Sequence, residues 1–323
     1  METSTEPLRV QIIQDLADKV RHEIGKVIVG QEETIDLMLV ALLTRGHVLI
    51  EGVPGIAKTL TARMMAKTLS AGFARIQFTP DLMPSDILGT MVFRMKTEEF
   101  TFNPGPVFSN LVLIDEINRA PAKTQAALFE VMEERQVTMD GKTWPMQEPF
   151  MVLATQNPIE QEGTYKLPEA QLDRFLFRIK ISYPSLEEEM AILLRFREDF
   201  FQKVIEEVQP VVSPQEITQC AAIIEKVMIR DELLDYIARI VHETRNNRDL
   251  FLGASPRASL AVMKSSKAMA AIQGRDFVTP DDIRFVMGHV LNHRIILSPE
   301  KEMEGATTEE AIHQIISRIE VPR

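Results

Sequence analysis

The feature that most constrains this chain is a glycine-rich turn between a short apolar run and a helical pattern. Residues 47–50 are typical of a buried strand, and apolar side chains recur at helical spacing over residues 58–71. The turn between them, residues 51–59, reads Glu-Gly-Val-Pro-Gly-Ile-Ala-Lys-Thr. Such a turn directs successive backbone N–H groups and the positive end of the helix dipole at one small volume. The sequence therefore predicts a strand, turn and helix that bind a phosphate chain.

The end of this turn predicts contacts with a magnesium triphosphate. Lys58 would reach the β- and γ-phosphates, and the Thr59 hydroxyl would ligate Mg²⁺. Ala57 stands where the pattern G-x-x-x-x-G-K-S/T has its second glycine. Because alanine tolerates a helical backbone better than a left-handed one, we expect Ala57 to belong to the first helical turn. The backbone expected to surround the phosphates is that of Gly52, Val53, Pro54, Gly55, Ile56 and Ala57.

Two later apolar runs end in polar side chains. Residues 111–114 precede Asp115 and Glu116, and residues 150–155 come shortly before Asn157. Because open α/β sheets bind ligands at the carboxyl ends of their strands, we expect these side chains to lie near the turn. Asp115 would hold the Mg²⁺ shell, Glu116 would polarise the attacking water, and Asn157 could hydrogen-bond the γ-phosphate. Taken singly, the acidic pair could merely end a core strand, and Asn-Pro is ordinary turn chemistry.

The order of the apolar patterns predicts two domains. Up to Tyr183 strands and helices alternate, which predicts a parallel sheet covered on both faces. Beyond it helical spacing prevails, so we expect an α/β P-loop NTPase core over residues 1–183 and an all-α lid over residues 184–323. Segments 87–102 and 136–148 interrupt the alternation, and each predicts a β-hairpin. Their alternatives are a functional insertion and ordinary decoration of the sheet edge.

Four segments in this order resemble the MoxR family of AAA+ ATPases, and the resemblance covers nearly the whole chain. The alanine before the P-loop lysine is itself shared with that family. The resemblance implies an AAA+ core and lid that bind ATP and Mg²⁺ and hydrolyse ATP to ADP and phosphate. The segments are the turn at 51–59, Leu113–Pro121, Ala154–Pro158 and Leu167–Phe175.

The resemblance also implies a role for individual residues. Arg174 corresponds to an arginine finger that reaches the nucleotide of a neighbouring subunit, and Arg257 resembles sensor 2, which touches the γ-phosphate of its own subunit. A planar guanidinium suits the charge that develops on the transferred phosphoryl group. Without the family, Arg174 could be a surface partner of Asp173, and Arg257 a solvated residue at a helix start. The remaining correspondences are Lys58 and Thr59 to Walker A, Asp115 and Glu116 to Walker B, Asn157 to sensor 1, and Val29, Gly30 and Gln31 to the adenine pocket.

The function implied by the resemblance is that of a ring-forming remodelling machine. We expect a homo-oligomer, a hexamer in this family, that remodels or matures a client enzyme, with metal insertion as one outcome. A protein with a von Willebrand factor A domain would be its partner, and the two hairpins would transmit motion to the client. One alternative is an ATP-gated scaffold with little turnover, and another is a DNA-directed motor. Arg119 could be a second interface arginine or simply exposed.

Composition bears on the partners and the location. The formal net charge of −11 provides no positive surface of the kind that binds nucleic acid. No apolar run approaches 18 residues and no leader pattern is evident, so we expect a cytoplasmic protein without a membrane span. Cys220 fits a helical apolar pattern and is interpreted as a small buried residue. His289 and His293 have the i, i+4 spacing of metal ligands but lack a third ligand, which favours packing roles.

Overall fold

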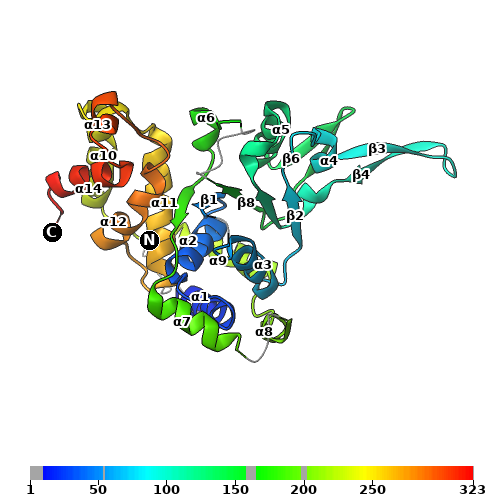
Figure 1. The fold of residues 1–323 in the computed structure, drawn as a ribbon, viewed down its shortest axis with the longest axis horizontal. Coiled ribbons are helices and arrows are strands. Elements are labelled where there is room, and N and C mark those ends of the chain that lie inside the picture. Colours follow the sequence, from blue (N-terminus) through cyan, green and yellow to red (C-terminus); the bar gives the residue numbers. More distant parts are fainter. Residues whose placement is uncertain (1–9, 54, 158–164, 198–201, 323) are drawn as a thin grey trace, which may run out of the picture.

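A computed structural model describes residues 10–53, 55–157, 165–197 and 202–322 of the chain, without the side chains of residues 202–204. Figure 1 shows a central sheet with helices on both faces, a helical lid beside it, and two hairpins on the side away from the lid. The predicted α/β core with a parallel sheet is confirmed. Among the described helices, none combines the length and the apolar character needed to cross a membrane.

The central sheet has five parallel strands in the order β2-β5-β8-β1-β9. Every residue of β1 and β5 is buried, because helices cover both faces of the sheet. The two residues Leu113 and Ile114 of β5 illustrate this, since they belong to separate apolar clusters on opposite faces. The strands are β1 (Val48–Gly52), β2 (Phe73–Gln77), β5 (Leu111–Asp115), β8 (Met151–Gln156) and β9 (Phe177–Ile181).

The core helices divide between the two faces. The first apolar cluster contains residues of α1, α2 and α3, and the second contains residues of α4 and α5. The helix α2 is apolar on nearly its whole circumference because it lies between the sheet and the lid. The bounds are α1 (Gln11–Gly25), α2 (Glu32–Leu43), α3 (Lys58–Thr68), α4 (Pro84–Leu88), α5 (Ala122–Glu134) and α6 (Glu169–Leu172), with 3₁₀ turns η1 (Pro106–Phe108) and η2 (Ile117–Arg119).

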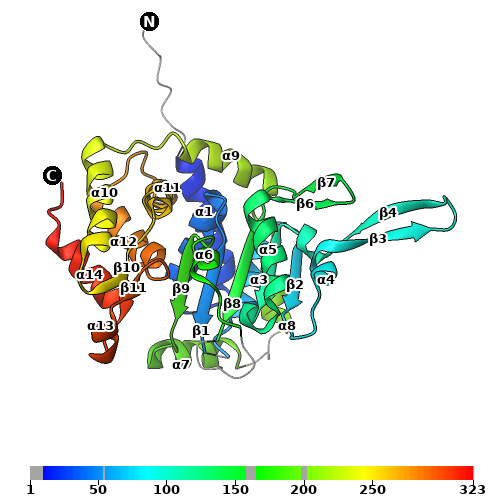
Figure 2. The same ribbon diagram turned by 90° about the horizontal axis from the view of Figure 1, so that it is seen from above.

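Both predicted hairpins are confirmed, as β3 (Gly89–Arg94) with β4 (Glu99–Pro104) and β6 (Gln136–Met139) with β7 (Lys142–Pro145). The second one turns at Asp140 and Gly141, which both have positive φ as a tight hairpin turn requires. The rings of Phe102 and Trp144 stack with centroids 4.2 Å apart. This stack joins the bases of the two hairpins, which extend in the same direction in Figure 2.

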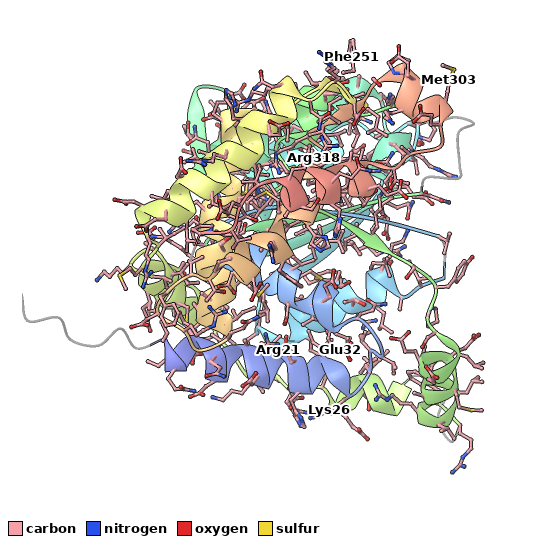
Figure 3. All side chains as sticks on the ribbon, turned by 90° about the vertical axis from the view of Figure 1, so that its left-hand side faces the viewer. Arg21, Lys26, Glu32, Phe251, Met303 and Arg318 are labelled. Carbon is pink, nitrogen blue, oxygen red and sulfur yellow. The ribbon has the colours of Figure 1, made fainter. Side chains whose placement is uncertain are left out.

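The lid consists of helices and one short antiparallel strand pair. The predicted helical lid is confirmed, with the addition of one pair, β10 (Leu250–Leu252) with β11 (Ile296–Leu297). Helix α12 ends at Leu291, before β11 begins. The side chains of Phe251 and Met303 lie at the opposite end of the molecule from Arg21 and Lys26 of α1 (Figure 3). The helices are α9 (Pro214–Ile224), α10 (Asp231–Asn246), α11 (Pro256–Ile272), α12 (Pro280–Leu291), α13 (Pro299–Met303) and α14 (Thr308–Arg318).

The segment between sheet and lid lies on the core. It contains α7 (Leu186–Arg195) and α8 (Gln202–Glu207). Arg195 Nη1 donates to the Gly25 carbonyl at 2.6 Å, and the backbone N–H of Val211 donates to the Thr68 carbonyl at 2.8 Å. The domain boundary expected at residue 184 stays a prediction, and these contacts favour a lid that begins with α9.

The lid packs against α1, α2 and β9. Helix α11 contacts α1 and α2, and α12 contacts β9, so one apolar cluster runs from the sheet into the lid. The lid therefore extends the core sideways. This placement decides which end of the sheet the lid residues can reach.

Candidate functional site: two edges of one sheet

The P-loop connects the carboxyl end of β1 to the first residue of α3, Lys58. Ala57 has φ 62° and ψ 18°, so the prediction that it belongs to the first helical turn is wrong. A left-handed alanine costs about 1–2 kcal/mol, so neighbouring contacts must hold it. Thr61 contributes to this, since its backbone N–H donates to the Ala57 carbonyl at 2.9 Å, and its single hydroxyl proton is shared between that carbonyl, at 3.1 Å, and Gln31 Oε1. Pro54 lies outside the described residues.

Gln31 ties the P-loop to the chain before α2. Its Nε2 donates to the Ile56 carbonyl at 3.0 Å, and its Oε1 accepts from the Thr61 hydroxyl at 2.9 Å. The expected role of Gln31 was to line the adenine pocket. The structure adds a second role, because one bond holds the loop backbone at Ile56 and the other holds the Thr61 side chain at the start of α3.

A cavity of about 630 Å³ opens beside the P-loop. Val29, Gly30 and Gln31 line it, as the family resemblance implies. Its volume lies in the range of small-molecule sites, about 300–1,000 Å³. The sequence did not identify Ile181 and Tyr183, which also line the cavity, since they lie at the end of β9 and just beyond it, far from the P-loop in the chain. Other lining residues are Gly55, Ile56 and Ala57.

The three polar strand ends expected to meet at the P-loop do lie at the same edge of the sheet. Strand β8 separates β5 from β1, and Asn157 directly follows it. Asp115 and Asn157 are both buried, while Glu116 is partly exposed. Lys58 Nζ donates to the Gly52 carbonyl at 2.6 Å, and so folds back over the loop.

Thr155, a residue that the motifs did not identify, bonds to the Asp115 side chain and to the Glu116 backbone. Its hydroxyl donates to Asp115 Oδ1 at 3.2 Å and accepts the backbone N–H of Glu116 at 3.0 Å. Glu116 has φ 58°, a left-handed conformation that is rare outside glycine and clusters at functional sites. The bond from Thr155 therefore contributes to holding an otherwise unfavourable backbone.

Strand β2 supplies the other neighbours of the acidic pair. Arg75 Nε donates to Asp115 Oδ2 at 2.6 Å, and Gln77 Nε2 donates to Glu116 Oε2 at 2.6 Å. Arg119 Nε lies 3.3 Å from the same Glu116 oxygen. The only signal for Arg75 and Gln77 in the sequence was that polar residues alternate in a short strand. Their partners follow from the pairing of β2 with β5.

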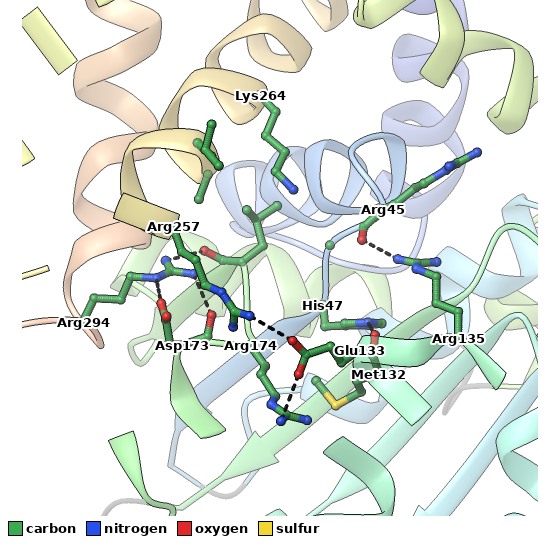
Figure 4. A pocket seen from close by; sticks show the side chains of 14 residues that line it. Arg45, His47, Met132, Glu133, Arg135, Asp173, Arg174, Arg257, Lys264 and Arg294 are labelled. Atoms are coloured by element: carbon green, nitrogen blue, oxygen red, sulfur yellow. Dashed lines mark hydrogen bonds and ion pairs between the residues drawn. The ribbon is translucent and has the colours of Figure 1, made fainter. Parts of the chain in front are cut away.

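Arg174 and Arg257 lie at the opposite edge of the sheet from the P-loop. Both contact Glu133, at the end of α5, with N–O distances of 2.9 Å (Figure 4). Their cavity, of about 330 Å³, is also lined by His47 and Leu176, which precede β1 and β9. The length of β1, five residues or roughly 16 Å, separates this cavity from the P-loop.

The expectation that Arg257 touches the γ-phosphate of its own subunit is therefore wrong for this structure. Arg257 lies in the first turn of α11, and α11 packs against α1 and α2. That packing directs the start of α11 toward the amino ends of the strands. Asp173, the alternative partner considered for Arg174, instead binds Arg294 of the lid at 2.6 Å.

The cavity at this edge carries an excess of positive charge. Among the residues that the structure describes, the acidic ones that line it are Glu133 and Asp173. Desolvation, and then the charges of Arg135 and Arg294, lower the pKa of Lys264, which points toward the cavity in Figure 4. Such crowding of cations favours an anion of matching size. The six basic lining residues are Arg45, Arg135, Arg174, Arg257, Lys264 and Arg294.

His47 forms the floor of this cavity and is neutral in the folded protein. Its Nδ1 accepts the backbone N–H of Val152 at 2.9 Å, so its Nε2 donates to the Met132 carbonyl at 3.0 Å. Burial, and then the charge of Arg135, lower the pKa of His47 to about 3. The ring thereby joins β1, β8 and α5.

This pKa predicts acid sensitivity. A pKa of about 3 lies below the ordinary value of 6.5, so the unfolded chain binds the His47 proton more readily than the folded one. The contribution of neutral His47 to the free energy of unfolding is therefore complete above pH 6.5. It is lost as the pH falls toward 3, by up to about 1.4 kcal/mol per pH unit. In denaturant titrations at several pH values, His47→Gln should be less stable at pH 7 but decline less steeply in acid. The exposed His313→Gln serves as the control, and parallel curves for His47→Gln and wild type would contradict the prediction.

The remaining histidine and cysteine predictions concern packing. His289 Nε2 contacts Glu33 at 3.0 Å, whereas His293 is buried and bonds to the Phe175 carbonyl, so the two rings serve different neighbours. No group of metal-binding side chains occurs among the residues that the structure describes. Cys220 is buried, and burial raises the pKa of its thiol to about 11, which agrees with a packing role.

Known proteins resemble this chain over nearly all of its length. Residues 47–177 match the ATPase family associated with various cellular activities (AAA), and residues 242–315 match the AAA lid domain. The chain is 45% identical to Uncharacterized protein YeaC of Bacillus subtilis, over 96% of both chains. It is 44% identical to Chaperone MoxR1 of Mycobacterium tuberculosis, over 93% of this chain and 81% of that one. A crystal structure of a proposed ATPase from Cytophaga hutchinsonii has a TM-score of 0.89 at 43% identity, over 97% of each chain.

Proposed function

Because the chain belongs to the MoxR family of AAA+ ATPases, we propose that it hydrolyses ATP with Mg²⁺ to remodel a protein client. The observation that carries the proposal is the shared edge of the sheet: Asp115, Glu116 and Asn157 end strands next to the P-loop and Lys58. A triphosphate in the loop would lie within reach of a cation, two carboxylates and an amide, which are the groups that phosphoryl transfer uses.

The residues at this edge fit the magnesium ion. Thr59 offers a hydroxyl and Asp115 a buried carboxylate, and Mg²⁺ prefers such oxygen ligands. When bound, the ion would neutralise charge on the β- and γ-phosphates. Lys58 would exchange the Gly52 carbonyl for phosphate oxygens. Thr155 would keep Asp115 oriented through the bond it already makes.

Glu116 would orient and polarise the attacking water. Within the part of the chain that the structure describes, its side-chain contacts with Gln77 and Arg119 both use Oε2, which leaves Oε1 for the water. Asn157, one strand away, would bind the γ-phosphate or the same water through its amide. Arg119 would therefore act beside Glu116 at the P-loop edge of the sheet. The proposed interface arginines lie at the other edge.

The two arginines at the opposite edge would serve a neighbouring subunit. Since Arg174 and Arg257 cannot reach the P-loop of their own chain in this structure, a head-to-tail ring would bring them to the next nucleotide. Such arginines contribute about 10³- to 10⁵-fold in related phosphoryl transfers. The family resemblance favours a hexamer. Hydrolysis would then depend on assembly.

The client and its adaptor are proposed from resemblance alone. A relative is named Chaperone MoxR1, which supports a chaperone-like activity. The client would be an enzyme that needs maturation or metal insertion, with a von Willebrand factor A domain protein as partner. The exposed β3–β4 hairpin, with Phe93 and Met95 on its surface, would transmit motion to it.

Phosphate release by the purified, assembled protein tests the proposed activity. We expect hydrolysis of ATP with Mg²⁺ and none with excess chelator. Lys58→Ala should bind a fluorescent ATP analogue about 10- to 100-fold more weakly, because a charged contact to the phosphates is lost. The exposed Lys96→Ala is the matched control. Unchanged binding by Lys58→Ala, or no hydrolysis by assembled wild-type protein, would overturn the proposal.

A further inference from the structure

One carboxylate lies between the two arginines at the amino-terminal edge of the sheet. Glu133 Oε2 is 2.9 Å from Arg174 Nη2, and Glu133 Oε1 is 2.9 Å from Arg257 Nη2. Arg174 belongs to the core and Arg257 to the lid, so Glu133 joins guanidinium groups from two parts of the molecule. Figure 4 shows the bridge among the side chains that line the cavity.

The bridge leaves most donors of both arginines available. A guanidinium carries five N–H groups. Within the described residues Arg174 uses Nη2 for Glu133 and Nη1 for the Phe129 carbonyl, while the side chain of Arg257 bonds to Glu133 alone. Phosphate oxygens could therefore bind the remaining N–H groups without displacing the carboxylate.

Glu133 has little to contribute to holding the lid in place. The Arg257 and Glu133 side chains are 59% and 36% exposed, and exposed ion pairs add little stability. The lid is instead anchored by the shared apolar cluster and by Arg294, whose side chain is 4% exposed and binds Asp173. A change at Glu133 should leave the fold intact and affect the position of Arg257.

The charges explain why a carboxylate is needed between these arginines. Without the negative charge of the Glu133 carboxylate between them, the guanidinium groups of Arg174 and Arg257 would repel each other. Arg174 is still held by the Phe129 carbonyl, but Arg257 would lose the side-chain bond that orients it among the described residues. The pair would then separate into one fixed arginine and one mobile one.

We propose that Glu133 is a positioning residue for hydrolysis in the neighbouring subunit. It holds Arg174 and Arg257 as one unit, so that both guanidinium groups meet the phosphates of the neighbour's ATP together. Glu133 does not touch the nucleotide and takes no part in bond making. This inference rests on the proposed action of the two arginines across the subunit interface.

The first test compares Glu133→Ala, Glu133→Gln and Glu133→Asp with wild type. We expect Glu133→Ala to lower kcat about 10- to 100-fold, the effect of misplacing a group by about 1 Å. The KM for ATP and the thermal midpoint should stay near wild type, because the P-loop lies at the other edge. Gln can bridge only one arginine and Asp is shorter, so the kcat values of Glu133→Gln and Glu133→Asp should lie between those of Glu133→Ala and wild type. Glu134→Ala, the same change one residue along the helix, is the control.

Mixed rings identify the subunit in which Glu133 acts. Glu116→Gln subunits cannot hydrolyse their own ATP but carry an intact arginine pair. Mixed one to one with Glu133→Ala subunits, they should restore hydrolysis at about one interface in four of a head-to-tail ring. The same mixture with Arg174→Ala tests the premise that the arginines act across the interface.

The outcomes separate the two proposals. Recovery in both mixtures supports the inference. If Glu133→Ala alone keeps wild-type turnover, Glu133 has no role in hydrolysis, and if turnover rises, Glu133 inhibits hydrolysis. In both cases the inference is wrong while the proposed function stands. If Arg174→Ala recovers but Glu133→Ala does not, Glu133 supports its own subunit, and the inference again fails. If neither mixture recovers, the interface premise fails and the inference falls with it.

Discussion

Glu116→Gln is expected to bind ATP with near wild-type affinity and to lose hydrolysis, by about 10²- to 10⁴-fold. The amide has the shape of the carboxylate but cannot accept a proton from the attacking water. Glu116 also lies one residue beyond the buried Asp115, so the substitution leaves the proposed magnesium ligand in place. Nucleotide binding and phosphate release on the same protein preparation would measure the two effects separately.

The position of Glu116 makes this substitution specific. Gln77 and Arg119 contact Oε2, and an amide oxygen can still accept at least one of these bonds. The left-handed backbone of the residue should persist, because the Thr155 bond uses its backbone N–H. Glu134→Gln, an exposed residue of α5, is the control. Turnover within a few-fold of wild type in Glu116→Gln would assign the water to another base.

Arg174→Ala is expected to retain ATP binding and to lose turnover in the assembled ring, by about 10³- to 10⁵-fold. Arg174 lies the length of β1 from its own P-loop, so affinity at that site should not change. The neighbour's γ-phosphate would lose the guanidinium that stabilises its developing charge. Single-turnover hydrolysis by assembled protein measures the chemical step without product release.

Controls for Arg174→Ala must separate chemistry from assembly. The oligomeric state should be compared with wild type before the rates are. Arg239→Ala removes a guanidinium that is 68% exposed and pairs with Asp235 within its own helix, so it should change neither property. Wild-type turnover in Arg174→Ala would mean that another arginine of the cavity, such as Arg257, serves the neighbour by itself.

The alternation of apolar runs determined the core, because each run had the length and composition of its element. A strand buried on both faces must be apolar throughout, and residues 111–114 show this in the sequence itself. The signal for the hairpin at residues 136–148 also lay in adjacent residues, since Asp140-Gly141 is a turn that favours positive φ. The site at the P-loop was predictable for a related reason. Its polar residues end consecutive apolar runs, and parallel strands bring such ends to one edge.

Contacts between distant segments could not be predicted in the same way. The left-handed Ala57 depends on Gln31 and Thr61, and the orientation of the acidic pair depends on Thr155. Short strands such as β10 and β11 have too few residues to show the alternation of apolar and polar side chains by which a strand is recognised. They exist because the lid brings them together.

The sequence by itself determined the phosphate-binding turn, the acidic strand end and the alternating α/β core, because each is encoded by neighbouring residues and their periodicity. Only the tertiary structure decided that Arg257 lies with Arg174 and Glu133 at the edge away from the P-loop. The direction in which the lid packs depends on which apolar faces of α1, α2 and α11 fit one another. Such complementarity is a property of surfaces assembled from distant parts of the chain, and no local pattern records it.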